Sequence, residues 1–155
     1  MKYIESKKNE IFKNLKKLLL KSKTRKNSKR FIVQGLKEII LCLDSNYELI
    51  QLYTCSEIHS KKYDDLYIKY KSTDLSYNLY KELSYKEKGD GFLAIFSSKE
   101  FNLNKLILPK NPLLLVAESP EKPGNIGAIL RTADAAGVDA VIIANPKTEI
   151  YNPNI

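Results

Sequence analysis

Two short apolar runs near the carboxyl end of the sequence enclose a segment with helical periodicity. The runs, residues 113–117 (LLLVA) and 140–144 (AVIIA), have the length and composition of strands that are buried on both faces. Between them, apolar side chains recur at i, i+3, i+4 and i+7 from Ile126 to Ala133. Asn125 is a good N-cap residue, and Gly137 suits the position just after a helix. The pattern therefore predicts strand, helix and strand, the crossover unit of a parallel sheet.

Short strands and amphipathic helices alternate through the earlier part of the sequence. Leucine and isoleucine at helical spacing predict a helix over residues 3–20, Gly35 opens a second helix, and Asp74 caps a third. Strands are expected at residues 31–34, 49–54, 66–70 and 92–96. This alternation predicts the α/β fold class, with a small α/β sandwich as the first domain.

The sequence is expected to contain two domains. Residues 1–105 form the sandwich, residues 106–112 a linker, and residues 113–155 the crossover unit. The last part is too short to bury a self-sufficient core, so we expect it to be the beginning of a larger domain.

The excess positive charge lies in the first thirty residues. The chain has a formal net charge of +8, but residues 1–30 carry a balance of +10 and the remaining chain −2. Within this region, residues 21–30 (KSKTRKNSKR) are predicted to form a basic turn. A basic segment beside a structured domain is typical of RNA binding, although a solvated loop is the simpler alternative. The candidate phosphate contacts are Lys21, Lys23, Arg25, Lys26, Lys29 and Arg30.

Several other classes of protein are disfavoured by the sequence. The longest apolar run of the basic segment, residues 18–20, is too short for a signal peptide or a membrane span. A basic helix could lie on an anionic membrane, but its apolar face is narrow. Cys42 and Cys55 do not form a C-x-x-C pair and His59 is the single histidine, so no metal site is expected. A reducing, cytoplasmic location is expected.

Gly127, Arg131 and Asp134 share a second face of the predicted helix, at i, i+4 and i+7. Glycine allows another backbone or a ligand to come close, and free amides at a helix start favour an anion. A guanidinium nearby would complete a phosphate or ribose site. In the simpler interpretation, Gly127 only shapes a turn and Arg131 pairs with Asp134 on the surface.

The stretch PGNIGAILRTADAAG (residues 123–137) resembles the first signature motif of the SpoU family of RNA 2′-O-ribose methyltransferases. The resemblance implies a knotted, S-adenosylmethionine-dependent enzyme. It also implies that Arg131 contacts the substrate phosphate or assists deprotonation of the 2′-hydroxyl, and that Asn125 holds loop and helix in register. Lys122 departs from the family, which often has Asp there. The matching residues are Asn125, Gly127, Ile129, Arg131, Thr132, Ala133 and Gly137.

The earlier part of the chain resembles the N-terminal substrate-binding domain of many SpoU enzymes. The resemblance rests on Arg30 followed by FIVQG and an amphipathic helix, and on GDGFLAIF at residues 89–96. That domain is similar to the kink-turn-binding ribosomal proteins. Gln34 departs from the family, which often has Glu before the glycine.

The two resemblances together imply an RNA 2′-O-ribose methyltransferase that acts on ribosomal RNA and is a homodimer. The later family motifs, which hold S-adenosylmethionine, are not in the sequence. No cofactor-binding residue is therefore expected in this chain, and the chain alone is expected to be inactive. Two alternatives stay open: a stand-alone, non-catalytic RNA-binding module, and a nucleotide-binding regulator that uses the anion site.

Overall fold

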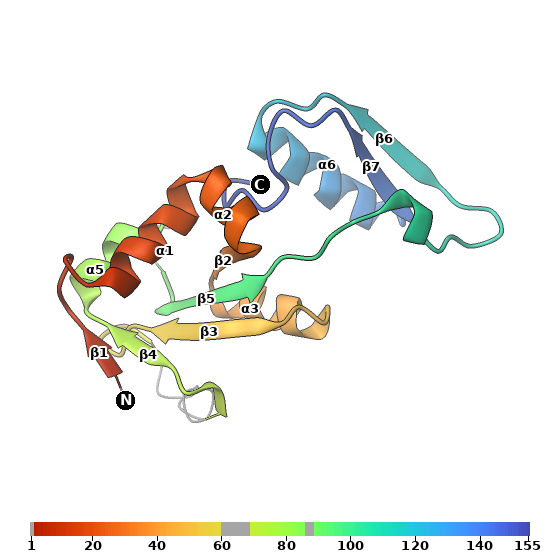
Figure 1. Cartoon of the computed structure of the whole chain (residues 1–155). Coiled ribbons are helices and arrows are strands. Elements are labelled where there is room, and N and C mark those ends of the chain that lie inside the picture. Colours follow the sequence, from red (N-terminus) through yellow and green to blue (C-terminus); the bar gives the residue numbers. More distant parts are fainter. Residues whose placement is uncertain (1, 60–68, 86–88) are drawn as a thin grey trace. The chain divides into compact units, whose positions relative to one another are not determined.

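The α/β class expected from the sequence is confirmed by the computed structural model (Figure 1), which describes residues 2–59, 69–85 and 89–155. The chain separates into two units, Met1–Lys99 and Glu100–Ile155, and each has its own sheet. The predicted division of roles between a substrate-binding domain, a linker and a methyltransferase domain stays a prediction.

The first unit is built on a mixed five-stranded sheet in the order β1-β4-β3-β5-β2. Strands β1 (Lys2–Ile4), β4 (Thr73–Leu75) and β3 (Leu49–Thr54) run parallel to one another. Strand β5 (Phe92–Ser97) is antiparallel to both β3 and β2 (Arg30–Gln34). The strands predicted at residues 31–34, 49–54 and 92–96 are confirmed. Three parallel strands therefore end at the same edge of this sheet.

Helices α1 (Glu10–Leu20) and α5 (Tyr77–Leu83) lie together on the same face of the sheet (Figure 1). The apolar side chains of each helix recur at helical spacing and so face the sheet, and the strands alternate their side chains between its two faces. The helices and this face of the sheet together form a core of 13 buried residues. The aromatic residues of this core are Phe12, Tyr53 and Tyr80, and its leucines include Leu15, Leu79 and Leu93.

Helix α3 (Leu36–Asp44) covers the opposite face. Its buried side chains, Leu36 and Ile39, pack where Phe31 and Phe96 stack with ring centroids 6.0 Å apart. Successive side chains of β5 point to opposite faces of the sheet. Ile95 therefore lies in the core under α1, and the next residue, Phe96, lies on the other face. The first unit is therefore a three-layer α/β/α sandwich, as the sequence predicted.

The start of the chain differs from the prediction. The helix expected over residues 3–20 begins only at Glu10, because the Asn9 carboxamide accepts a hydrogen bond from the Ile11 amide (2.9 Å) and caps it. The residues before the cap form β1, which pairs with β4.

A second difference concerns the strand predicted at residues 66–70. Residues 66–68 lie outside the described part of the chain, and Lys69 and Tyr70 are helical. The strand of this region, β4, lies at Thr73–Leu75, where it pairs with both β1 and β3. Pairing with neighbouring strands therefore decides its position.

The second unit contains the predicted crossover. Strands β6 (Leu114–Glu118) and β7 (Ala140–Ala144) are parallel, and α6 (Pro123–Ala135) connects them. Ile126 and Ala133 are buried by the packing of α6. A short 3-10 turn, η2 (Leu103–Lys105), precedes the crossover. Across the described parts of both units, no helix has the length and apolar character needed to cross a membrane.

Gln34 shows how the sheet holds a helix end. Its side chain is 3% exposed, and its amide nitrogen donates to the carbonyl oxygen of Leu83 (2.6 Å) at the end of α5. Its amide oxygen accepts from the backbone N–H of Tyr85 (3.1 Å). The position therefore requires one donor and one acceptor on the same side chain, which a carboxamide supplies and an ionised carboxylate does not.

Gln34→Glu is expected to make stability depend on pH. The carboxyl group matches both partners only when protonated, so its folded-state pKa will lie above the ordinary value of about 4.3. The protonated carboxyl group stabilises the folded protein fully at pH values below its unfolded-state pKa, and this stabilisation is lost as the pH rises through its folded-state pKa. Urea unfolding should show near-wild-type stability at acid pH and a loss of at least about 1–3 kcal/mol at pH 8. Equal losses at both pH values would contradict this role of Gln34.

Candidate functional site

Helix α6 begins earlier than predicted. Its N-cap is Lys122 in an extended conformation, and Pro123 is the first helical residue, a position that proline favours because its fixed φ suits a helix and its missing N–H costs nothing there. Asn125 is therefore not the cap. Its backbone N–H donates to the Lys122 carbonyl oxygen (3.0 Å), and its side chain is exposed in the first turn.

Gly127 is the point where another backbone meets α6. The residue is buried, and a Cβ added there would lie 2.7 Å from the carbonyl carbon of Ile155. No side chain fits at that distance, so Gly127 allows the turn at residues 152–155 to pack on the helix. The close approach expected from the sequence is that of a backbone segment.

Arg131 lies one turn further along α6 and is exposed, as is Asp134. Among the residues that the structure describes, no ion pair joins their side chains. The surface pair that would give Arg131 a purely structural role is therefore not formed. The helix ends as predicted, with Gly137 at a φ of +67°, where glycine is favoured.

A carboxylate joins the loops that follow β6 and β7. The Glu118 Oε1 atom accepts hydrogen bonds from the Asn145 carboxamide and the Ser119 hydroxyl, both at 2.9 Å. These two donors hold the pKa of Glu118 below its ordinary value. Ser119 and Asn145 both have left-handed backbones, with φ of +48° and +46°. Asn145 lies 27 positions after Glu118 in the sequence, so no local pattern indicates this contact.

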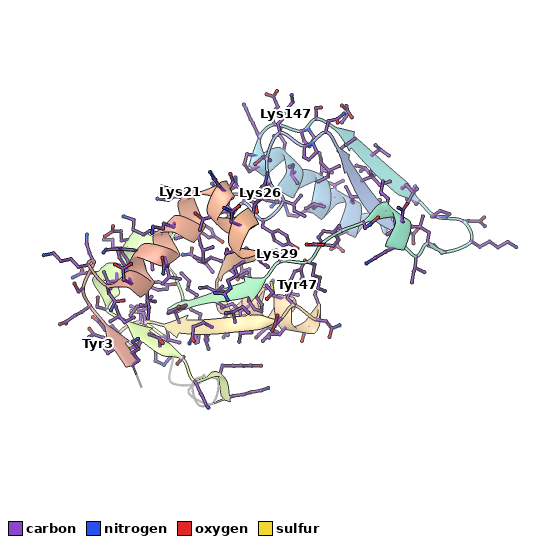
Figure 2. All side chains as sticks on the ribbon, viewed as in Figure 1. Tyr3, Lys21, Lys26, Lys29, Tyr47 and Lys147 are labelled. Atoms are coloured by element: carbon purple, nitrogen blue, oxygen red, sulfur yellow. The ribbon has the colours of Figure 1, made fainter. Side chains whose placement is uncertain are left out.

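The basic segment is a helix rather than the predicted loop. Residues Ser22–Ser28 form α2, and Lys29, with a left-handed φ of 52°, ends it. The turn expected from polar composition is replaced because the segment packs against α1 and β2. The helix and its flanks expose five of the six predicted cations, three of which are labelled in Figure 2. They are Lys21, Lys23, Lys26, Lys29 and Arg30.

Arg25 is the exception, and its assignment as a phosphate contact is wrong. Only 4% of it is exposed, and one guanidinium nitrogen donates to the carbonyl oxygens of Leu18 (2.7 Å) and Leu19 (3.0 Å). These carbonyls end α1 and lack partners within the helix. Arg25 therefore caps α1, a role that its position in a basic run concealed.

The predicted residues thus fall into two groups. The exposed cations surround α2 in the first unit, and Asn125, Gly127 and Arg131 lie on α6 in the second. Within the described ranges, no group of three or more potential metal ligands is found. Both cysteines are free thiols, and burial raises the pKa of Cys55 to about 11, so it is not a nucleophile at neutral pH.

Two protein-family models match the chain in succession. The MRM3-like substrate binding domain matches residues 9–94, which is more than half of the chain, and the SpoU rRNA Methylase family matches residues 112–155. The chain belongs to the family of proteins with an MRM3-like substrate binding domain, and its residues 112–155 match the SpoU rRNA Methylase family. The family resemblance of both the α6 motif and the N-terminal unit is thereby confirmed.

The relatives that this chain matches are longer. The 23S rRNA (guanosine(2553)-2'-O)-methyltransferase RlmP of Bacillus subtilis (strain 168) is 30% identical over 98% of the chain, which covers 58% of RlmP. A solved RNA 2'-O ribose methyltransferase matches with a TM-score of 0.81 and 33% identity, over 98% of this chain and 58% of that one. The chain therefore spans less than two thirds of the length of these relatives.

A further solved structure shows the fold alone. The SpoU methyltransferase AviRb from Streptomyces viridochromogenes, in complex with AdoMet, matches with a TM-score of 0.82 and 24% identity. The match includes 95% of this chain and 57% of the AviRb chain. The fold of this chain is thus similar to that of a known SpoU methyltransferase.

Arg25→Met is expected to destabilise the first unit by about 1–3 kcal/mol, because it leaves the buried carbonyls at the end of α1 without a donor. Thermal or urea unfolding measures the loss. Lys26→Met is the matched control: it removes a neighbouring exposed charge and should change stability by no more than about 0.5 kcal/mol. Equal effects of the two substitutions would show that the cap is unimportant.

Proposed function

We propose that this chain acts in an RNA 2′-O-ribose methyltransferase that uses S-adenosylmethionine and modifies ribosomal RNA. One observation carries the proposal: Arg131 is exposed on α6 without an ion pair to Asp134, at the position that matches the SpoU motif, and the helix follows an MRM3-like unit. The names of the relatives support the choice of substrate and cofactor. We also propose that the enzyme is a homodimer, as the family resemblance implies.

The residues of this chain would bind and orient the RNA substrate. S-adenosylmethionine would supply an electrophilic methyl group. The space beside Gly127 is filled by the backbone of Ile155, and no residue of this chain is assigned to the adenosyl group. Arg131 offers a planar set of N–H donors that would hold the phosphate beside the target nucleotide or stabilise negative charge on the 2′-oxygen as it loses its proton. The exposed Asn125 carboxamide would add a neutral donor about 1.7 turns earlier in α6.

The surface around α2 is proposed to bind the phosphate backbone of the RNA. Its five exposed cations lie within ten consecutive residues, and α2 is short enough for Lys21 and Arg30 to flank it closely. Cations arranged in this way release condensed counterions from RNA, so their contribution to affinity weakens as salt rises.

The first test replaces the α2 surface. Changing Lys21, Lys23, Lys26, Lys29 and Arg30 to Ala, with Arg25 retained, should weaken rRNA binding strongly. Log affinity falls as log salt concentration rises, and the loss of five phosphate contacts should make this slope shallower by about 3.5–4.5, at roughly 0.7–0.9 per contact. Filter binding at several salt concentrations measures both quantities.

A control for net charge uses five exposed lysines outside this surface. The replacement of Lys2, Lys8, Lys81, Lys105 and Lys110 by Ala removes the same formal charge. It should reduce the salt slope far less than the α2 replacement does. If the two five-fold variants behave alike, binding depends on net charge and the α2 surface has no special role.

The second test concerns Arg131. Arg131→Lys keeps the charge but removes the planar two-pronged donor. If Arg131 positions the phosphate or the 2′-oxygen, methyl transfer to rRNA by the full-length protein should fall on the order of 100-fold or more. Incorporation of labelled methyl groups from S-adenosylmethionine measures the rate.

Asp134→Ala is the matched control, because it removes the nearest candidate partner on the same face of α6 and leaves the guanidinium in place. Its activity and stability should stay close to wild type, since an exposed pair would contribute only about 0.2–1 kcal/mol. Full activity per folded molecule in Arg131→Lys would overturn the assignment of Arg131.

A further inference from the structure

A polar cavity of about 560 Å³ opens at the edge of the first sheet where β1, β4 and β3 end. Its walls come from Tyr3 in β1, from residues that follow the three parallel strands, and from the start of α5. The crevice beyond the carboxyl ends of parallel strands is where open α/β sheets commonly bind ligands. The α2 surface, by contrast, adjoins β2 at the other edge of the sheet.

The chemistry of this cavity differs from that of the rest of the chain. Two tyrosine rings line it, Tyr3 with 54% and Tyr77 with 41% of the residue exposed, and two carboxylates accompany them, Glu5 and Glu57. None of the described residues that line it carries a positive charge. In a chain with a net charge of +8, this is a local concentration of acid and aromatic surface.

One carboxylate is fixed in place. Glu57 Oε1 accepts a hydrogen bond from the backbone N–H of Tyr77 (2.8 Å), which leaves Oε2 for another partner. The buried Asp74 holds the adjoining backbone, because it accepts bonds from the Ser56 amide (2.9 Å) and hydroxyl (2.6 Å). The acceptor is therefore held by the fold before any ligand binds.

The second carboxylate, that of Glu5, lies at the same cavity. In the described part of the chain, no hydrogen bond or ion pair involves the Glu5 side chain. Burial and the nearby negative charges of Glu57 and Glu5 raise the pKa of the Tyr3 hydroxyl. Both carboxylates therefore influence one tyrosine at the wall of the cavity, whose position on β1 is labelled in Figure 2.

We propose that this cavity binds the guanidinium group of an arginine side chain in a basic polypeptide. Carboxylates accept paired N–H bonds from a guanidinium, and tyrosine rings attract a planar cation through their faces. RNA phosphates would be repelled by Glu5 and Glu57. The proposal does not depend on methyl transfer, because the site lies in the substrate-binding unit and uses none of the residues of α6.

The test is a titration of this chain with the peptide acetyl-Gly-Arg-Gly-amide, followed by NMR. The resonances of Tyr3 and Tyr77 should shift in a saturable way. The same peptide with citrulline in place of arginine has nearly the same shape but no charge, and should bind at least about tenfold more weakly, as expected for the loss of a charge-assisted hydrogen bond. Equal binding of the two peptides would overturn the proposal.

Variants locate the site. In Glu57→Gln the side-chain oxygen can still accept from the Tyr77 amide, so the fold should be kept while the charge is lost. Combined with Glu5→Gln, this change should reduce arginine-peptide binding to the level of the citrulline peptide. Glu48→Gln, which changes an exposed carboxylate bonded to the Ser97 hydroxyl, is the matched control and should have no effect.

Two further outcomes would reject the proposal. One is wild-type affinity for the arginine peptide in the Glu5→Gln, Glu57→Gln variant. The other is saturable binding of guanosine monophosphate to Tyr3 and Tyr77 in place of the peptide, which would make the cavity a nucleotide site. RNA binding through α2 should stay unchanged in the double variant, so failure here is distinguishable from failure of the proposed function.

Discussion

Burial of β5 is the constraint on which the first unit depends. The strand is hydrogen-bonded on both sides, and five of its six residues are buried. Leu93 and Ile95 complete the core under α1 and α5, while Phe92 and Phe96 lie on the α3 side. Because one strand supplies both faces, loss of its pairing would expose two cores at once. The α2 surface and the acidic cavity each rest on strands that β5 holds together.

Polar side chains then fix the helices on this apolar framework. Arg25 holds the end of α1, Gln34 the end of α5, and Asp90 accepts from the Leu36 amide (2.6 Å) at the start of α3. Each side chain satisfies backbone groups that a helix leaves without internal partners. Hydrophobic burial is non-directional, so these bonds decide where each helix begins and ends on the sheet.

The sequence predicted those features that depend on local pattern. Strand β3 and the crossover from β6 to β7 follow from apolar runs and turn residues, and the α6 motif pointed to Arg131. The predictions failed where contacts between separate elements decide the structure. The segment at residues 21–30 is helical because it packs on α1 and β2, and Glu118 meets an amide 27 positions away. Neither contact can be recognised from the spacing of apolar and polar residues in the sequence.

The two charged surfaces lie at different places on the sheet. Helix α2 adjoins β2 at one edge, whereas the cavity with Glu5 and Glu57 lies beyond the carboxyl ends of β1, β4 and β3. Two strand spacings of roughly 4.8 Å separate β3, the nearest of these strands, from β2, about 10 Å in all. That exceeds the Debye length of about 8 Å at physiological salt, so the carboxylates do not neutralise the cations. Under the two proposals, one small domain would attract an RNA backbone at one edge of the sheet and a basic polypeptide beyond the ends of its parallel strands, and neither partner would compete for the other's site.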